Sequence, residues 1–598
     1  MRTPRLSKCA WAVAIVACSA LASVASAAGA SRPIAILGAT VFDATGTAPY
    51  EASVVIAGSR IAAVGSDVPI PKDAEIIDAK GQALLPGFYD LHTHWTVSGS
   101  PATTPQIAAA DISHGVTTVD DFNAAPESYA ARRRWLKTLP APHVNLCARI
   151  STPGGHGADW ADEATTRLAI TPQSARYAVD SVMRYHPDCL GEVFTDGWRY
   201  GIQPDHTSMN EDTLAALDDE AHRYGLTVLT HTVRVERGYE AAEAHVDVIG
   251  HSLQDRDIDA ETVALIKANH VAIAPTLAVY EPIKPGQPRP HEPYGAALQR
   301  RLLNWGIARH NLKVLYDAGV PIVLGTDSGM PDTPHGVSTL HEMELMVSAG
   351  MPASAVLIAG TANSARVMGE LADRGTITVG KRADLVLIHG RPWADIHDVR
   401  NVSRVFVDGR LVFGPGAPPN PAGTAMPAAS VAAVVDDFER RDGRSNLDTR
   451  VTTDPDTGLD RTAEIIQTVP RASGGHALLM TAQMSVKNQP HAEVVVPLTP
   501  GSVQPVDVRA YHGLQFDIRG DGAYTAIVST LDGWWGATVA GAAEWQTVRL
   551  PFTVLRPLKS KYSTPGVWTG DDVIELRFED SRPSHVQTWM EIDNLRFY

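Results

Sequence analysis

The feature that most constrains the fold is a repeated alternation of short apolar runs and helical stretches through the middle of the chain. Helical periodicity is clearest at 212–224 and 259–268. The eight apolar runs are 87–91, 116–119, 143–150, 190–194, 226–229, 246–249, 271–274 and 320–324. Runs without polar alternation are typical of parallel strands covered on both faces. Eight such units predict a (β/α)8 TIM-like barrel over 86–371.

The segments on either side of this region read differently. Short alternating stretches broken by glycines occupy 33–85, and strand pattern returns at 372–414. These two segments are predicted to join in one small discontinuous β-sandwich domain. A stretch rich in Pro, Gly and Ala predicts a linker over 415–431. From 432 to 598 the pattern is all-β, which predicts a β-sandwich or jelly roll and an α/β chain overall.

The first 27 residues have the pattern of an export signal. An apolar stretch at 10–24 precedes the small residues Ala25, Ser26 and Ala27. The basic residues before it are Arg2, Arg5 and Lys8. We expect cleavage after Ala27 and a periplasmic or secreted protein, with a lipoprotein site at Cys18 as the alternative. No other segment is long and apolar enough to predict a membrane span.

Charge and cysteine usage narrow the partners and the stabilising bonds. The net charge of −16 argues against nucleic acid, because phosphate binding needs clustered Lys and Arg. After signal cleavage, Cys147 and Cys189 remain. Export permits a disulfide, but both cysteines lie in apolar runs, so buried thiols are expected. Whether the protein forms a homo-oligomer is left open.

Polar residues gather where the predicted parallel strands end. Active-site side chains of such barrels project from the carboxyl ends of the strands. In His92-Thr93-His94, alternation along the strand puts both imidazoles on one side. The other strand ends supply Glu192, His231, His251 and Asp327. Four histidines and two carboxylates suit two divalent ions, most simply zinc.

This ligand set predicts a hydrolase. A water that bridges two divalent ions loses a proton near neutral pH and becomes a nucleophilic hydroxide. A carboxylate that faces this water can take the proton and pass it to the leaving group. Asp327 is the best placed candidate for this catalytic role.

Four motifs resemble the amidohydrolase superfamily, especially the branch of imidazolonepropionase and prolidase-type dipeptidases. They are LPGFYDLHTH (85–94), GVTT (115–118), GTDS (325–328) and GKRADL (380–385). The resemblance covers 33–414. It implies one ion on His92, His94 and Asp327, and a second ion on His231 and His251.

One position departs from many members of that superfamily, which bridge their metals with a carboxylated lysine at the fourth strand. No lysine occurs between Lys137 and Lys267, and Glu192 stands in the matching place. A glutamate can bridge two ions directly, so Glu192 is predicted as the bridge. The alternative is a one-metal enzyme in which Glu192 is merely buried nearby.

Substrate contacts are predicted from the loops that follow the strands. His156, in a Gly-Gly-His-Gly segment, is expected to polarise the scissile carbonyl or hold substrate, with a structural loop as the alternative. Arginines in these loops can grip a carboxylate bidentately or form surface salt bridges. The remaining candidates are Arg199, Tyr200, Arg234 and His335. Asp121 is expected to be a structural hydrogen-bond acceptor, and Glu342 and Glu344 to serve packing or helix charge.

The C-terminal region resembles the jelly-roll family of complex I intermediate-associated protein 30, which is similar to carbohydrate-binding modules. The segments 436–439 and 591–597 carry that resemblance. Three tryptophans can either stack on a carbohydrate or peptide ligand or fill the core. They are Trp534, Trp535 and Trp568.

The leading prediction is therefore hydrolysis of a C–N bond in a small-molecule substrate, a dipeptide or N-acyl amino acid with a free carboxylate. Hydrolysis of a cyclic amide, as by imidazolonepropionase, or of a lactone is the alternative. A deaminase is less favoured, because those relatives generally use one metal. A non-catalytic surface-binding protein is disfavoured because all the expected ligand positions are present.

Overall fold

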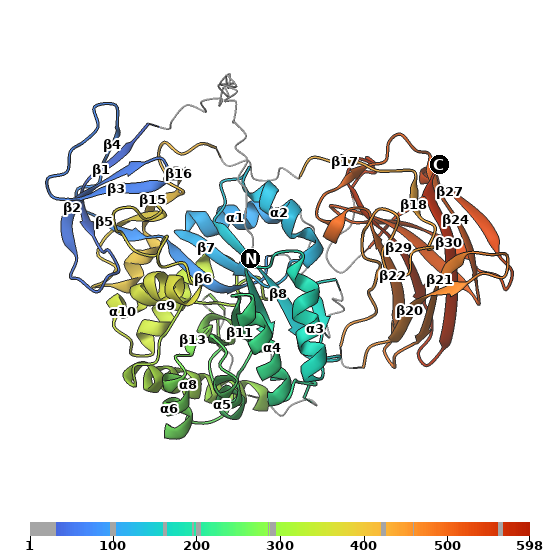
Figure 1. Ribbon diagram of the computed structural model, residues 1–598, viewed down its shortest axis with the longest axis horizontal. Coiled ribbons are helices and arrows are strands. Elements are labelled where there is room, and N and C mark those ends of the chain that lie inside the picture. Colours follow the sequence, from blue (N-terminus) through green and yellow to red (C-terminus); the bar gives the residue numbers. More distant parts are fainter. Residues whose placement is uncertain are drawn as a thin grey trace, which may run out of the picture.

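A computed structural model describes residues 32–95, 103–158, 164–193, 196–198, 205–284, 286–287, 295–419, 426–458, 460–559 and 566–598. The predicted signal peptide, Arg199, Tyr200 and part of the predicted linker lie outside the described residues. Figure 1 shows a central barrel with a β-sheet region on one side and the C-terminal sheets on the other. None of the described helices combines the length and apolarity that a membrane span requires.

Seven parallel strands form the wall of the barrel in the described part of the chain, in the order β13-β12-β11-β10-β8-β7-β6. The strands are β6 (Phe88–Thr93), β7 (Val116–Asp121), β8 (His143–Ser151), β10 (Cys189–Val193), β11 (Thr227–Thr230), β12 (Val248–Gly250) and β13 (Ala272–Ala274). A short strand, β9 (Thr166–Leu168), pairs with the edge of β8. The chain is therefore a mixed α/β protein with a nearly closed, TIM-like barrel.

The eighth predicted run, 320–324, closes the barrel without forming a regular strand. Ile322 bridges to β13 in parallel, and Ser328 bridges to β6 in the same way. Pro321 has no amide hydrogen to donate. The amide of Leu324 donates to Ser364 Oγ (3.3 Å), and that of Thr326 donates to Asp90 Oδ1 (3.0 Å). Because side chains accept these hydrogens, the ladder is interrupted where the sequence predicts a strand.

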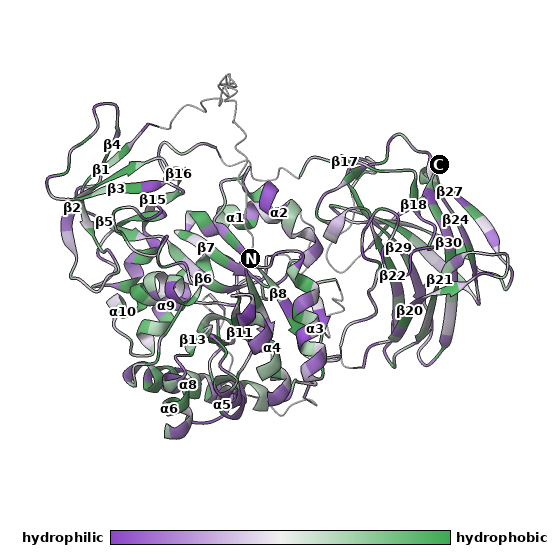
Figure 2. Cartoon of the chain, viewed as in Figure 1, coloured by the Kyte–Doolittle hydropathy of each residue, from purple (hydrophilic) through white to green (hydrophobic). Residues whose placement is uncertain are grey.

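Helices cover the outside of the barrel. They are α1 (Thr104–Ser113), α2 (Tyr129–Leu136), α3 (Pro172–Met183), α4 (Glu211–Arg223), α5 (Val235–Glu243), α6 (Ala260–Ala268), α7 (Leu277–Tyr280), α8 (Ala296–Asp317), α9 (Val337–Ser348), α10 (Ala353–Ile358) and α11 (Ser364–Val367). In α4, Asn210 caps the first turn by accepting from the amide of Thr213. Its buried Leu214, Leu217 and Ala221 recur at helical spacing and face the barrel. Figure 2 shows hydrophilic residues on the helices α3 and α4.

One eight-stranded sheet combines strands from before and after the barrel. Its members are β1 (Ile34–Val41), β2 (Tyr50–Ala57), β3 (Arg60–Gly65), β4 (Glu75–Asp78), β5 (Gln82–Pro86), β14 (Leu385–His389), β15 (Val402–Val407) and β16 (Arg410–Phe413). Strand β5 pairs antiparallel with β14, so segments about 300 residues apart lie side by side. Since β5 leads directly into β6, this sheet anchors the strand that carries His92.

The C-terminal part consists of two further sheets that share one apolar core. The first contains β17 (Ala429–Ser430), β19 (Thr452–Thr453), β22 (His491–Pro497), β23 (Val506–Asp507), β25 (Ala523–Thr530), β26 (Trp534–Ala540), β28 (Arg556–Leu558) and β29 (Val573–Ser581). The second contains β18 (Val434–Asp436), β20 (Ala463–Pro470), β21 (His476–Gln483), β24 (Gly513–Gly520), β27 (Gln546–Pro551) and β30 (Gln587–Phe597). The first strand, β17, lies inside the predicted linker, because its backbone pairing with β23 leaves no mark in composition.

The tryptophans of this region are mainly structural. Trp535 is buried in the shared core, and its ring packs edge-on against Trp568 at 5.8 Å between centroids. The guanidinium of Arg577 lies over the Trp534 ring, 4.8 Å from its centroid. Core packing, one of the two alternatives from sequence, therefore accounts for Trp535 and Trp568.

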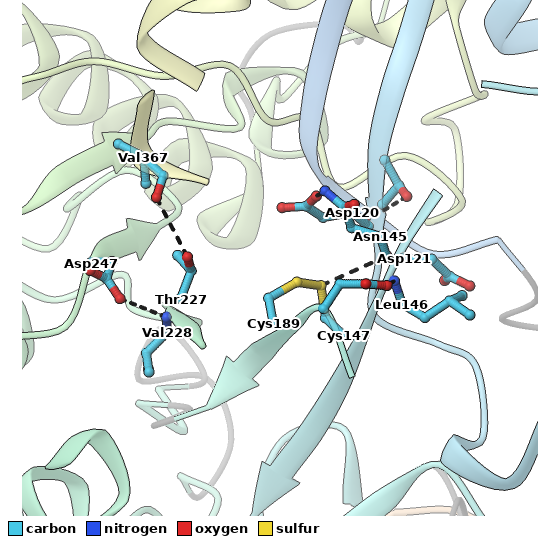
Figure 3. Close-up of a disulfide and its surroundings, with 12 residues drawn as sticks. Asp120, Asp121, Asn145, Leu146, Cys147, Cys189, Thr227, Val228, Asp247 and Val367 are labelled. Carbon is cyan, nitrogen blue, oxygen red and sulfur yellow. Dashed lines mark hydrogen bonds between the residues drawn. A yellow bond between two sulfur atoms is a disulfide. The ribbon is translucent and has the colours of Figure 1, made fainter. Parts of the chain in front are cut away.

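The expectation of two buried thiols is wrong, because Cys147 and Cys189 form a disulfide (Figure 3). The two residues are direct partners in the parallel pairing of β8 with β10, with Cα atoms 4.4 Å apart. Such a separation is within the range that a disulfide spans. The bond ties together the two strands that carry Arg149 and Glu192.

A half-buried histidine links α9 to the end of α7. His341 Nε2 lies 2.8 Å from Glu281, and its Nδ1 lies 3.2 Å from Glu344. Hydrogen bonds to these two carboxylates raise the pKa of His341 to about 9. Glu344 also pairs with Arg400, while Glu342 accepts the amides of Leu277 and Ala278 at the start of α7.

We expect His341→Gln to destabilise the fold at pH 6 and to have a much smaller effect at pH 9.5. Because the folded pKa is raised from about 6.5 to about 9, the stabilisation is complete below pH 6.5 and is lost as the pH rises through 9. The difference is on the order of 1–3 kcal/mol. Chemical denaturation at both pH values measures it, with His310→Gln, an exposed histidine on α8, as control. Equal destabilisation at both pH values would contradict the prediction.

Candidate metal centre

Four of the predicted ligands meet at the mouth of the barrel. His92 from β6, His94 directly after it, Glu192 near the end of β10 and Asp327 each offer one atom, all within 4.8 Å of one another. Asp327 Oδ1 lies 2.9 Å from His94 Nε2 and 3.6 Å from His92 Nε2. All four residues are buried, so these polar groups depend on one another or on an ion.

Glu192 is the member that the two parts of the site share. Its Oε1 lies 3.7 Å from His92 Nε2, 3.6 Å from His94 Nε2 and 3.5 Å from His231 Nδ1. A second group of possible ligand atoms consists of Glu192, His231 and His156. The geometry thus places one carboxylate oxygen between the two sets of imidazoles.

His251 lies beside His231. Its Nε2 is 2.7 Å from His231 Nδ1, and its Nδ1 is 2.6 Å from the hydroxyl of Thr276. The ring of His251 also lies 4.6 Å from that of His92. Thr276 therefore fixes one nitrogen of His251, and the other faces His231, so the structure does not group His251 with the other candidate ligand atoms.

The atoms around Glu192 Oε1 are spaced for a shared metal, whereas the pairs Asp327–His94 and His251–His231 lie at hydrogen-bond distance. The 3.5–3.7 Å gaps around Glu192 Oε1 exceed ordinary hydrogen-bond distances. Ligand atoms at tetrahedral positions around zinc are separated by about 3.4 Å. Nitrogen and carboxylate donors in this arrangement suit zinc or a similar divalent ion.

The electrostatics also favour neutral imidazoles at two positions. Burial lowers the pKa of His92, and burial together with the neighbouring His231 and His92 holds the pKa of His251 well below its ordinary value. For Glu192, burial favours the protonated form, but Arg149 and His94 outweigh it and keep its pKa well below normal. Neutral histidines and an ionised carboxylate are the forms that bind a metal.

Backbone strain is concentrated at the same place. Glu192, His251 and Asp327 have φ values of +49°, +78° and +63°. The left-handed region is unfavourable for non-glycine residues and persists only where the surroundings impose it. Three ligand candidates in this conformation indicate that the strand ends turn sharply to bring their side chains inward.

A threonine–aspartate network supports the floor of the site. Buried Asp90 accepts from the hydroxyls of Thr326 (2.7 Å) and Thr339 (2.8 Å). It also accepts from the amide of Thr326, next to Asp327. The network ties β6 to the segment that carries Asp327, although sequence reasoning gave Asp90 no role.

Arg149 is the functional residue that sequence reasoning missed most completely. Its side chain is fully buried, and Nη2 lies 2.6 Å from Glu192 Oε2. The same nitrogen donates to Asn123 Oδ1 at 3.1 Å and lies 3.3 Å from His94 Nδ1. The only signal in the sequence was an arginine inside an otherwise apolar predicted strand.

Two predicted substrate contacts, Arg234 and His335, lie against other groups of the protein. Arg234 Nη2 donates to the backbone carbonyl of Asp196 (2.8 Å), and Asp196 accepts the amides of Val233 and Arg234. His335 Nδ1 lies 3.2 Å from Ser328 Oγ, and its ring packs edge-on against Trp95. These contacts are structural, so substrate binding by Arg234 and His335 stays a prediction.

Two further residues from the sequence analysis, His156 and Asp121, have clear surroundings. The ring of His156 lies 4.1 Å from that of His231, so it faces the centre. Its loop is held by Arg461 of the C-terminal part, which donates to the carbonyl of Ala158 (2.8 Å). Asp121 Oδ1 accepts the amides of Trp95 and Asn123, as expected for a structural acceptor.

Gly191 shapes the strand that presents Glu192. A Cβ at this position would lie 2.2 Å from Phe122 Cδ1, and the Phe122 ring packs against His92. We expect Gly191→Ala to destabilise the barrel by about 1–3 kcal/mol, as overpacking does, and to lower activity. Thermal unfolding and turnover measure both effects.

A second substitution tests the cause. Phe122→Leu added to Gly191→Ala should recover part of the stability by opening space. Gly306→Ala on α8, where a Cβ meets nothing within 4 Å, is the matched control and should be neutral or stabilising. Identical stability of the wild type and Gly191→Ala would contradict the packing argument.

Known proteins resemble more than half of the chain. Adenine deaminase 2 of Rhizobium meliloti (strain 1021) is 29% identical over 420 residues, which is 67% of this chain. The match spans 60% of the length of that deaminase. Imidazolonepropionase of Deinococcus radiodurans is 24% identical over 58% of this chain and 87% of its own.

Solved structures resemble the chain over a similar share of its length. A protein from Bifidobacterium longum that is assigned as a prolidase superposes with a TM-score of 0.57 and 26% identity, covering 65% of this chain and 97% of its own. A Xaa-Pro dipeptidase with bound methionine gives a TM-score of 0.56 at 23% identity and shows the same fold, over 64% of this chain and all of its own. The profile of the Amidohydrolase family matches residues 83–412, more than half of the chain, and the chain therefore belongs to the amidohydrolase family.

Proposed function

We propose that this protein is a binuclear, zinc-dependent amidohydrolase that cleaves a C–N bond in a dipeptide or N-acyl amino acid with a free carboxylate. The observation that carries the proposal is the position of Glu192 Oε1. This oxygen lies within 3.7 Å of His92 and His94 on one side and 3.5 Å from His231 on the other. A shared carboxylate between two sets of imidazoles supports two ions rather than one.

His92, His94 and Asp327 would hold one ion, and His231 and His251 the other, with Glu192 between them. His156 lies close enough to His231 and Glu192 to serve the second ion or the substrate. Bound divalent metal supplies Lewis acidity toward the scissile carbonyl and toward water.

Asp327 is proposed to move the proton. Its Oδ1 is 2.9 Å from His94 Nε2, and its side chain keeps 10% of its surface exposed. Burial raises its pKa, but the hydrogen bond from His94 and the nearby His92 bring it below the ordinary value in the metal-free site. A bound cation favours the ionised carboxylate in the same way, so Asp327 starts as a base. It can then accept a proton from the attacking water and return it to the leaving nitrogen.

The substrate class rests on the prolidase and dipeptidase among the similar structures. The adenine deaminase and imidazolonepropionase relatives favour a second candidate, attack at a ring carbon of a nitrogen heterocycle. Both reactions break a C–N bond and use the same proton transfer. They differ in whether the site must bind a free carboxylate.

A substrate screen separates the candidates. Zinc- and manganese-loaded protein is offered dipeptides, N-acyl amino acids, cyclic amides, lactones and adenine. Turnover of carboxylate-bearing amides supports the first candidate. Turnover of adenine or of cyclic amides alone would favour the second, and activity on lactones alone would overturn both.

Glu192→Gln tests the number of ions. The amide keeps the size of the side chain but loses the charge that favours two cations, so we expect metal content to fall from about two ions to about one, with kcat reduced at least about tenfold. Elemental analysis and turnover of the same preparation measure this. A Glu192→Gln protein that retained both ions and full activity would remove the bridging role.

We also propose that the protein is exported and that its C-terminal region has an accessory role. The basic and apolar pattern of residues 1–27 supports cleavage after Ala27. The region 432–598 is proposed to be a jelly-roll domain. The segments 33–85 and 372–414 are proposed to form the small β-domain together. Mass spectrometry of the mature N-terminus after expression in a bacterium tests export.

A further inference from the structure

We propose that Arg149 is a positioning residue that occupies Oε2 of Glu192, so that this carboxylate meets the metal centre through Oε1 alone. The inference rests on the proposed binuclear function and specifies how its bridge is held. It follows from the 2.6 Å ion pair between Arg149 Nη2 and Glu192 Oε2. Both side chains are almost entirely buried.

The strands deliver the two groups to the same level of the barrel. β8 and β10 pair in parallel, and Arg149 is the direct partner of Gly191, the residue before Glu192. The disulfide between Cys147 and Cys189 fixes this register two residues earlier. Gly157 gives the guanidinium room, because a Cβ there would lie 3.3 Å from Arg149 Cδ.

A guanidinium in this position needs a carboxylate. Moving a charge out of water costs several kcal/mol unless it is paired and hydrogen-bonded. Glu192 supplies the opposite charge in an ion pair, and Asn123 Oδ1 accepts a hydrogen bond from the guanidinium at 3.1 Å. Removing Arg149 would leave Glu192 Oε2 without its cation, free to rotate toward the imidazoles.

The ion pair between Arg149 and Glu192 has consequences for metal binding. A carboxylate that bridges with both oxygens offers one to each ion, but here one oxygen is already bound to a cation. The other, Oε1, faces His92, His94 and His231 at 3.5–3.7 Å.

Metal titration of the purified protein tests whether Arg149 positions Glu192 for metal binding. We compare wild type, Arg149→Met and Arg149→Lys by calorimetric titration of zinc into apoprotein and by the visible spectrum of the cobalt-loaded protein. Loss of a group that orients a ligand typically costs about 10–100-fold in metal affinity. We expect the dissociation constant of at least one ion to rise by this factor in Arg149→Met, with an altered cobalt spectrum and a smaller rise in Arg149→Lys.

The control is Arg132→Met, which removes a buried arginine from α2 whose Nε donates to Ser128 Oγ. It should leave both metal affinities and the cobalt spectrum as in wild type. Unchanged metal binding in folded Arg149→Met, or the same change in Arg132→Met, would overturn the proposal.

Two further outcomes keep the test decisive. If Arg149→Met does not fold, Arg149→Lys and Asn123→Ala take its place. Wild-type metal affinities in both variants would overturn the proposal. If the wild type itself binds one ion, the binuclear function fails. In that case the cobalt spectrum of Arg149→Lys still reports whether Arg149 orients Glu192.

Discussion

Asp327→Asn is expected to lower kcat by about 10²–10⁴-fold, the range that a general acid–base group contributes. Asparagine has the size of aspartate and keeps one oxygen to face His94, so the geometry at the end of the barrel is largely retained. It cannot accept a proton from water or return one to the leaving nitrogen. The effect should therefore fall on kcat more than on KM.

Steady-state kinetics on the best substrate of the screen measure this loss, with metal content determined on the same sample. Metal content matters because Asp327 is also a proposed ligand. Asp218→Asn, a buried aspartate on α4 beside His222, is the matched control and should keep wild-type turnover. More than a tenth of wild-type kcat in a fully metal-loaded Asp327→Asn would remove Asp327 from the proton path.

The barrel could be predicted because its strands carry their own signal. Continuous apolar runs marked seven strands, including β7 and β10, to within a few residues. The eighth run was expected as a strand, but the amide of Leu324 and that of Thr326, two residues beyond the run, donate to side chains. A pattern of hydrophobic residues cannot show where a backbone amide finds its acceptor.

The ligand candidates could be predicted because the fold itself orders them. Side chains at the carboxyl ends of parallel strands share one mouth, so His92, His94 and Asp327 were expected to meet. The grouping of His156 with His231 and Glu192 was not expected, because it depends on a loop between β8 and β9. Loop conformation is poorly specified by local sequence.

The position of Arg149 and the disulfide could not be predicted from the sequence, for a related reason. Both depend on the register between β8 and β10, which sets Cys147 opposite Cys189 and Arg149 opposite Gly191. Register in a barrel is fixed by packing across the whole sheet. An arginine in an apolar run looks like an exception until its partner strand is known.

Removing the metal is expected to abolish turnover and to destabilise the barrel selectively. The side chains of His92, His94, Glu192 and Asp327 are between 0% and 10% exposed, so without an ion these polar groups remain buried with poor partners. An ion present at 1,000 times its dissociation constant stabilises the folded state by about 4 kcal/mol. Chelation should lower the unfolding temperature of the barrel by several degrees and reduce kcat to background.

The C-terminal sheets provide the control within the same molecule. Their core is separate from that of the barrel, so an unfolding transition of these sheets should not move on chelation. Scanning calorimetry of holoprotein, chelated protein and protein reloaded with zinc measures both transitions, and turnover is assayed in parallel. Zinc should restore activity and the barrel transition together, because the same buried ligands account for both. Full turnover after verified loss of metal would mean that the cluster at His92 and His94 is not the catalytic centre.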